Sequence, residues 1–139
     1  MPTQKFPGRY ESLERIATFI RAEAETTQLS HSDVFAVETA VDEAVSNIIE
    51  HAYHGEESGD IICTCITNPE GITVTLEDTG RPFDPHNIPE PNLNVPLMDR
   101  SEHGLGIYMM RKWMDEVRYE FENGTNRVIM VKRIKKQAG

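Results

Sequence analysis

The chain has 139 residues, a length that suits one domain with one hydrophobic core. Hydrophobic residues make up 38% of it, and its formal net charge of -9 disfavours non-specific nucleic-acid binding, which needs positive charge. No run approaches the roughly 18 apolar residues that a membrane span requires, and the N-terminus lacks the apolar core of a signal peptide. We therefore expect a single cytoplasmic domain over residues 1–139, with neither nucleic acid nor membrane as a direct partner.

The N-terminal part of the chain predicts a short strand and two helices. Residues 4–6 could form an edge strand, and the apolar residues between about 10 and 28 recur at helical spacing. A longer helix is predicted over residues 32–53, where an apolar stripe continues for several turns. Either Ser32 or Ser30 can cap this helix, because a serine side chain accepts a hydrogen bond from a free backbone N–H of the first turn.

A β-hairpin follows in the predicted order. Residues 61–67 are rich in β-branched side chains, residues 72–77 alternate apolar residues with threonine, and residues 68–71 between them form a turn sequence. Cys63 and Cys65 fall on one face of the first strand, at a spacing that rarely meets disulfide geometry. We interpret both as small buried hydrophobic residues, and a metal site that combines them with a histidine is the alternative.

The last third of the chain predicts a long loop, a helix and a second hairpin. Residues 81–103 contain five prolines and no sustained periodicity, and a loop this long inside a compact domain is usually functional. Residues 105–114 have helical spacing, and residues 116–122 and 127–134 flank the turn dipeptide Asn123-Gly124. This order of elements predicts an α/β two-layer sandwich of the α+β type, with a mixed, mostly antiparallel sheet covered on one face by about three helices.

Glu43 and Asn47 are four residues apart on the longest predicted helix, so they share one face of it. A carboxylate can accept a proton from a nucleophile, and an amide oxygen can bind Mg²⁺, a hard cation that prefers oxygen ligands. Asp42 is rotated by about 100° from Glu43 and need not share its site. The pair is also compatible with an ordinary polar stripe, and His51 on the same stripe with a hydrogen-bonded histidine at a helix end.

Two glycine motifs complete the candidate site. Asp78 and Gly80 end a predicted strand, where a carboxylate can accept a hydrogen bond from the exocyclic amine of adenine and a glycine lets the backbone approach a flat ring. Gly104 and Gly106 open a predicted helix, whose free N–H groups and dipole bind phosphate, and Arg100 could add positive charge. Each motif alone is a common turn or helix start, but their order and spacing together indicate an ATP site.

These segments resemble the bacterial anti-sigma-factor serine kinases, which belong to the GHKL superfamily of ATPases with gyrase B, Hsp90, histidine kinases and MutL. The resemblance covers roughly residues 5–135. Residues 43–53 are similar to the family's N box, residues 78–84 to its first glycine box and residues 104–107 to its second. The resemblance implies a Bergerat-type ATP-binding fold. The first predicted strand is short for the family, and this argues against a dimer built through that edge of the sheet.

The resemblance implies a role for each of these residues. Glu43 would be the general base, Asn47 the Mg²⁺ ligand and Asp78 the residue that reads adenine. Residues 84–103 would be the ATP lid. The remaining ATP-binding positions that the resemblance implies are Gly80, Arg100, Gly104, Leu105, Gly106 and Thr125.

The function that the resemblance implies is that of an ATP- and Mg²⁺-dependent protein serine/threonine kinase. It would phosphorylate an anti-anti-sigma (STAS-type) partner and alternately sequester a sigma factor. Glu43 would accept the proton of the partner's hydroxyl, and positioning and electrostatics would supply most of the catalysis. Two alternatives stay open: a nucleotide-gated regulator with little or no kinase activity, and an ATPase-type regulator outside sigma control. A homodimer also stays open.

Overall fold

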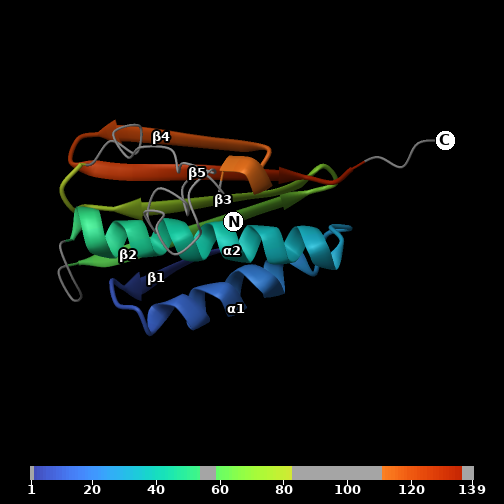
Figure 1. Ribbon diagram of the computed structural model, residues 1–139, viewed down its shortest axis with the longest axis horizontal. Helices are drawn as coiled ribbons and strands as arrows, with labels where there is room; N and C mark the ends of the chain where they lie inside the picture. Colours follow the sequence, from blue (N-terminus) through green and yellow to red (C-terminus); the bar gives the residue numbers. More distant parts are fainter. Residues whose placement is uncertain (1, 54–58, 83–110, 136–139) are drawn as a thin grey trace, which may run out of the picture.

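The computed structural model describes residues 2–53, 59–82 and 111–135. Within these ranges a five-stranded sheet forms one layer of the molecule and helices form the other (Figure 1). Every pair of neighbouring strands is antiparallel, in the order β1-β2-β3-β5-β4. The strands are β1 Thr3–Pro7, β2 Asp60–Asn68, β3 Gly71–Asp78, β4 Glu116–Glu122 and β5 Thr125–Arg133.

Two helices and a π-helical turn cover one face of this sheet (Figure 1). They are α1 Ser12–Ala24, α2 His31–Asn47 and η1 Ile48–Ala52, which continues α2 without a break. Of the third predicted helix, only residues 111–114 belong to the described part of the chain, and 111–113 are helical. The predicted two-layer α+β architecture is therefore confirmed. In the described residues no helix is long and apolar enough to span a membrane.

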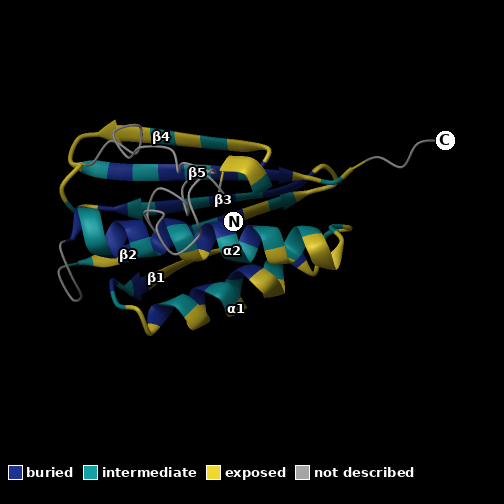
Figure 2. Cartoon of the chain, viewed as in Figure 1, coloured by how far each residue is buried: buried dark blue, intermediate teal, exposed yellow. Residues whose placement is uncertain are grey.

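The hydrophobic core lies between the helices and the sheet face that they cover (Figure 2). Strand residues alternate between this face and the opposite one, so buried residues recur at every second position of β3 and β5. Cys63 and Cys65 of β2 are both free thiols in this core, as predicted. Burial of apolar surface here is the main force that holds α1 and α2 on the sheet. The largest fully buried side chains include Phe6, Ile16, Ile20, Ile49, Ile61, Ile72, Leu76 and Met130.

Helix α2 differs from the prediction at both ends. Its N-cap is Ser30, whose Oγ accepts a hydrogen bond from the backbone N–H of Asp33 at 3.1 Å, so of the two predicted caps Ser32 is wrong. At the other end the predicted α-helix gives way to the π-helix η1. Here the N–H of Tyr53 donates to the carbonyl of Ile48, five residues back, at 2.9 Å. Such turns are rare in proteins and occur frequently at functional sites.

The two hairpin turns follow their predicted sequences. Asn123 and Gly124 between β4 and β5 have φ angles of 51° and 79°, the left-handed values that a tight two-residue turn needs. Asn68 closes the turn between β2 and β3, because its Oδ1 accepts the backbone N–H groups of Glu70 and Gly71 at 2.8 and 3.1 Å. The β2–β3 turn and the β4–β5 turn therefore lie at opposite ends of the sheet.

Candidate functional site

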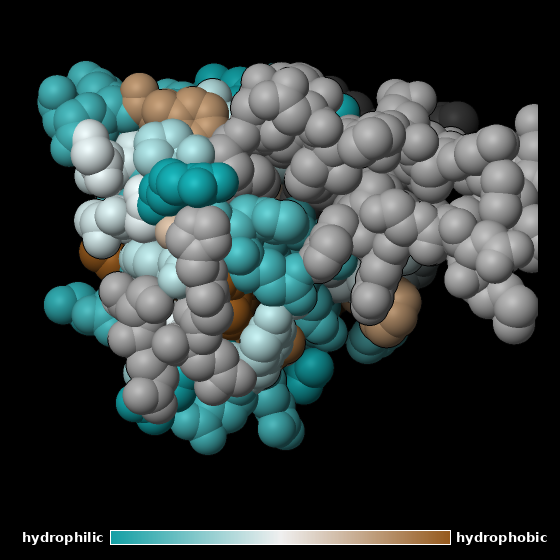
Figure 3. All heavy atoms as spheres, turned by 60° about the vertical axis from the view of Figure 1, so that its left-hand side comes forward, coloured by the Kyte–Doolittle hydropathy of each residue, from teal (hydrophilic) through white to brown (hydrophobic). Residues whose placement is uncertain are grey.

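A pocket opens between the C-terminal part of α2 and the strand ends next to the β4–β5 turn. This end of the molecule comes forward in Figure 3, where the surface outside the grey atoms is mostly hydrophilic with small apolar areas. Asn47 and Asp78, two of the predicted site residues, both line the pocket, although they come from different layers of the sandwich. The lining residues are Ala44, Asn47, Ile48, Asp78, Tyr119, Phe121, Asn126, Arg127 and Val128.

Asn47 is the last residue of α2, and its side chain is almost fully buried at 3% exposure. Its neighbours Ala44, Val45 and Ile48 are core residues, so the packing of the helix carries the amide inside with them. The Oδ1 atom of Asn47 has no hydrogen-bond partner among the described residues. An unpaired buried polar atom costs roughly 1–3 kcal/mol, so this oxygen is a position for a ligand. An amide oxygen suits Mg²⁺, and the predicted metal role of Asn47 therefore fits the structure.

Glu43 lies one helical turn before Asn47 and is partly buried. The negative charge of its carboxylate influences the pKa of the Tyr119 phenol. Tyr119 is a pocket residue of β4 that the sequence analysis did not select. Burial raises the pKa of Tyr119 to about 12, while the charge of Arg111 lowers this pKa and the charge of Glu43 raises it. The candidate base therefore shares its electrostatic surroundings with a phenol and a guanidinium at the edge of the pocket.

Asp42 is adjacent to Glu43 in the sequence but does not line the pocket. Partial burial and the nearby charge of Glu38 raise the pKa of Asp42. Glu38 in turn forms an ion pair with Arg21 of α1, at 2.6 Å between Nε and Oε1. The surroundings of Asp42 are thus those of the α1–α2 surface, consistent with the helical rotation that separates it from Glu43.

Asp78 is the last residue of β3, and 4% of it is exposed. Its Oδ1 accepts two hydrogen bonds, from the backbone N–H of Gly80 at 2.9 Å and from Nδ2 of Asn126 at 2.8 Å. Burial raises the pKa of Asp78, and these two hydrogen bonds lower it. Both bonds end on the same oxygen, which leaves Oδ2 as the acceptor for a ligand. This arrangement suits the predicted role of reading an exocyclic amine.

The end of β3 is fixed against the π-helix η1. The backbone N–H of Arg81 donates to the carbonyl of Ala52 at 2.8 Å, and the N–H of Thr79 donates to the hydroxyl of Tyr53 at 3.0 Å. A Cβ at Gly80 would lie only 2.5 Å from the oxygen of Ala52 and 2.8 Å from Cδ1 of Tyr53. Packing against Ala52 and Tyr53 thus explains why a glycine is needed at position 80, in addition to the predicted close approach of a ligand.

Sequence reasoning selected Thr125 at the start of β5, but its neighbour Asn126 enters the pocket. Thr125 lines a separate hollow together with Lys5 and Thr79, because adjacent side chains of a strand point to opposite faces. Asn126 is 6% exposed and lies on the face that also carries the buried Val128. The alternation along β5 was the signal in the sequence that could have identified Asn126.

Several predicted ATP-binding residues lie outside the described residues, and their roles stay predictions. These residues are Arg100, Gly104, Leu105 and Gly106, together with the predicted lid over residues 84–103. In the described ranges no three His, Cys, Asp or Glu side chains gather in a way that could hold a metal ion. The alternative cysteine site therefore finds no further ligand there. A cation at the pocket would instead combine Asn47 with phosphate oxygens, as Mg²⁺ does in many nucleotide sites.

Comparison with protein families and with individual proteins supports this assignment. Residues 6–132 match the histidine kinase-like ATPase domain. A serine-protein kinase RsbW of Bacillus cereus (strain AH187) is 26% identical, over 96% of this chain and 84% of its own length. An anti-sigma F factor of Clostridium novyi (strain NT) is 33% identical, over 90% of this chain and 87% of its own length.

Solved structures share the fold. The RsbU and RsbW domains of a Mycobacterium tuberculosis protein give a TM-score of 0.64 at 16% identity over 96% of this chain, which spans 33% of that longer chain. The catalytic domain of the histidine kinase ThkA gives a TM-score of 0.52 at 17% identity, over 94% of this chain and 95% of that domain. Because the family match extends over residues 6–132, and the resemblance found in the sequence predicted it, we conclude that this chain belongs to the histidine kinase-like ATPase family.

Proposed function

We propose that this chain is an ATP-dependent protein serine/threonine kinase that phosphorylates an anti-anti-sigma (STAS-type) partner and alternately binds a sigma factor. Relatives named serine-protein kinase RsbW and anti-sigma F factor, aligned over most of their own lengths, support both parts of this proposal. The observation that carries it is the buried, unpaired Oδ1 of Asn47 in the pocket that Asp78 also lines. Glu43 lies one helical turn before Asn47 on the same helix.

Two residues that line the pocket, Asp78 and Asn47, and the nearby Glu43 each have a defined task in the proposed reaction. Oδ2 of Asp78 accepts a hydrogen bond from the amine of adenine. Oδ1 of Asn47 would hold Mg²⁺, which would neutralise phosphate charge. Glu43 takes the proton of the partner's hydroxyl while that oxygen bonds to the γ-phosphorus and the bond to the leaving ADP oxygen breaks. Because the reaction consumes ATP, we assign it to the cytoplasm.

A homodimer is not part of the proposed reaction. The edge strand β1, through which a dimer could be built, has five residues, two more than the predicted 4–6. We therefore treat self-association as a separate property, to be measured by sedimentation of the purified chain.

The first experiment separates a kinase from a nucleotide-gated binding protein. Glu43→Gln keeps the shape of the side chain and removes its charge. Single-turnover transfer from Mg·ATP to an anti-anti-sigma partner, recovered by pull-down and read by mass spectrometry, should slow by about 10²- to 10⁴-fold, the usual effect of losing a general base. Binding of ATP and partner should be retained, because neither needs a proton acceptor.

Asp42→Asn is the matched control, since it removes a carboxylate from the next position of α2 but from a different face. It should lose far less activity than Glu43→Gln. A parent protein that binds ATP and partner but transfers nothing would favour the nucleotide-gated regulator. Transfer by Glu43→Gln at the parent's rate would remove Glu43 from the role of base while leaving the kinase assignment intact.

A further inference from the structure

Asn126 is placed to control the chemistry of Asp78. The two residues are direct partners in the β3–β5 pairing, and both are buried. Nδ2 of Asn126 donates to Oδ1 of Asp78 at 2.8 Å and to the carbonyl of Gly80 at 3.0 Å. Because both of these neighbours are acceptors, only the NH₂ group of the amide can face them. The orientation of Asn126 is therefore fixed by its surroundings.

The same arrangement assigns different tasks to the two carboxylate oxygens of Asp78. Oδ1 receives the amide N–H of Asn126 and, at 2.9 Å, the backbone N–H of Gly80. No other hydrogen bond to this carboxylate forms within the described residues, so Oδ2 is left for a ligand in the pocket. A proton on the carboxyl group would have to sit on Oδ2, since a proton on Oδ1 would face two donors.

We propose that Asn126 is a positioning residue that keeps Oδ2 of Asp78 a hydrogen-bond acceptor and so selects 6-amino purine nucleotides over 6-oxo purine nucleotides. The inference rests on the proposed nucleotide site. ATP carries an amine at C6, which donates to Oδ2, whereas ITP carries a carbonyl there, which needs a donor. Without Asn126, a protonated Asp78 can donate to that carbonyl, and the basis for discrimination is lost.

The electrostatics of Asp78 agree with this role. Burial raises the pKa of Asp78, and the hydrogen bonds from Asn126 and Gly80 lower it. Of the other titratable groups near it, Arg127 and Tyr119 line the same pocket. The hollow on the other side of Asp78 is lined by Lys5, Asp60 and Glu77. Loss of the Asn126 donor should raise the pKa of Asp78. ATP binding needs the ionised carboxylate, which exists above this pKa. On acidification the variant should therefore lose its affinity for ATP at a higher pH than the parent does.

The test compares Mg·ATP with Mg·ITP by calorimetric titration, at neutral and at mildly acidic pH. The parent should bind ATP more tightly than ITP. Asn126→Leu removes the donor at similar volume and should reduce the ATP-to-ITP affinity ratio by about 10-fold or more, the usual effect of losing a hydrogen bond to a charged group. Asn126→Ala, which also removes the donor, gives the same test if the leucine variant does not fold.

Two further variants separate positioning from stability. Asn126→Thr restores a donor and should recover most of the ATP-to-ITP ratio. Asn68→Ala removes the structural asparagine of the β2–β3 turn, at the other end of the sheet, and should lower stability without changing the ratio. An unchanged ratio in a folded Asn126→Leu or Asn126→Ala variant, or equal affinity of the parent for both nucleotides, would overturn the inference and leave the nucleotide site standing. A parent that binds neither nucleotide would overturn the proposed function together with it.

Discussion

At the scale of single residues, the proposed chemistry of the pocket depends on polar atoms that have no hydrogen-bond partner among the residues that the structure describes. Oδ1 of Asn47 is one of these atoms. Asp78 is 4% exposed, and only its Oδ1 accepts hydrogen bonds from described residues. A buried polar atom without a partner costs free energy of folding, which a bound ligand would offset.

Asp78→Asn should weaken ATP binding by about 10- to 150-fold, because a hydrogen bond to a buried charged group contributes roughly 1.5–3 kcal/mol. The amide also offers a donor where adenine presents a donor. Calorimetric titration of the folded variant measures the change. Asp60→Asn, an exposed carboxylate at the start of β2, is the control and should bind ATP like the parent. Parent-like affinity in Asp78→Asn would remove Asp78 from the site.

At the scale of elements, the pocket depends on the junction between η1 and the end of β3. The π-helical turn presents the carbonyl of Ala52 to the N–H of Arg81, and Tyr53 to the N–H of Thr79. These contacts set the position of the strand end and hence of Asp78. The fold of the strand end and the geometry of the pocket are therefore coupled.

Gly80→Ala should reduce both stability and ATP affinity. The added Cβ would meet the oxygen of Ala52 at 2.5 Å, and overpacking of this kind costs about 1–3 kcal/mol. Ser30→Ala is the comparison, because loss of the N-cap costs about 1 kcal/mol at the far end of α2. Urea unfolding should show both variants destabilised, while titration should show weaker ATP binding in Gly80→Ala alone. Equal ATP affinity in the two variants would contradict the coupling.

The elements that the sequence predicted correctly are those specified by local periodicity. Alternation in β2 and β3 and the Asn123-Gly124 turn are local signals, and the structure confirms them. The π-helix η1 was not predicted: its hydrogen bond from Tyr53 to Ile48 is local, but the residue that its end contacts, Arg81, is distant in sequence. Alternation along β5 could place Asn126 on the inner face, but its partnership with Asp78 depends on the register of β3 against β5, which the sequence alone does not give.

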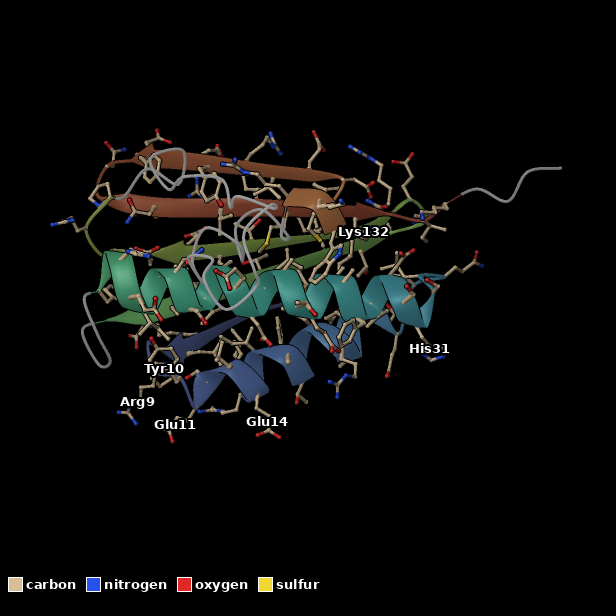
Figure 4. The ribbon with its side chains drawn as sticks, viewed as in Figure 1. Arg9, Tyr10, Glu11, Glu14, His31 and Lys132 are labelled. Atoms are coloured by element: carbon tan, nitrogen blue, oxygen red, sulfur yellow. The ribbon has the colours of Figure 1, made fainter. Side chains whose placement is uncertain are left out.

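At the scale of the whole molecule, the frame that carries the site is anchored at the end away from the pocket. Lys132 extends from β5 toward α2 (Figure 4). Its Nζ donates to the carbonyl of Trp113 at 2.6 Å and lies 3.8 Å from Oδ1 of Asp33 in the first turn of α2. This buried cation connects the sheet, the segment before β4 and the start of the helix whose other end carries Glu43 and Asn47.

The charge of the molecule bears on the proposed role of the metal. A chain with a formal net charge of -9 repels nucleotide phosphates at long range, so neutralisation by Mg²⁺ should contribute a large part of the affinity for ATP. Among the described residues of the pocket, Asn47 has an amide oxygen without a hydrogen-bond partner, which we propose as the ligand for this Mg²⁺. The central claim is therefore that the pocket binds Mg·ATP through Asn47.

The most direct test of this claim is calorimetric titration of ATP onto the parent and Asn47→Ala, each in Mg²⁺ and in EDTA. We predict that Mg²⁺ strengthens ATP binding by the parent and that Asn47→Ala loses this gain, by about 10-fold or more, since an interaction with a charged group contributes roughly 1.5–3 kcal/mol. Binding of ADP in EDTA should be the same in both proteins, because it does not use the metal. The same Mg²⁺ dependence in parent and variant would contradict the account and make Asn47 a structural residue.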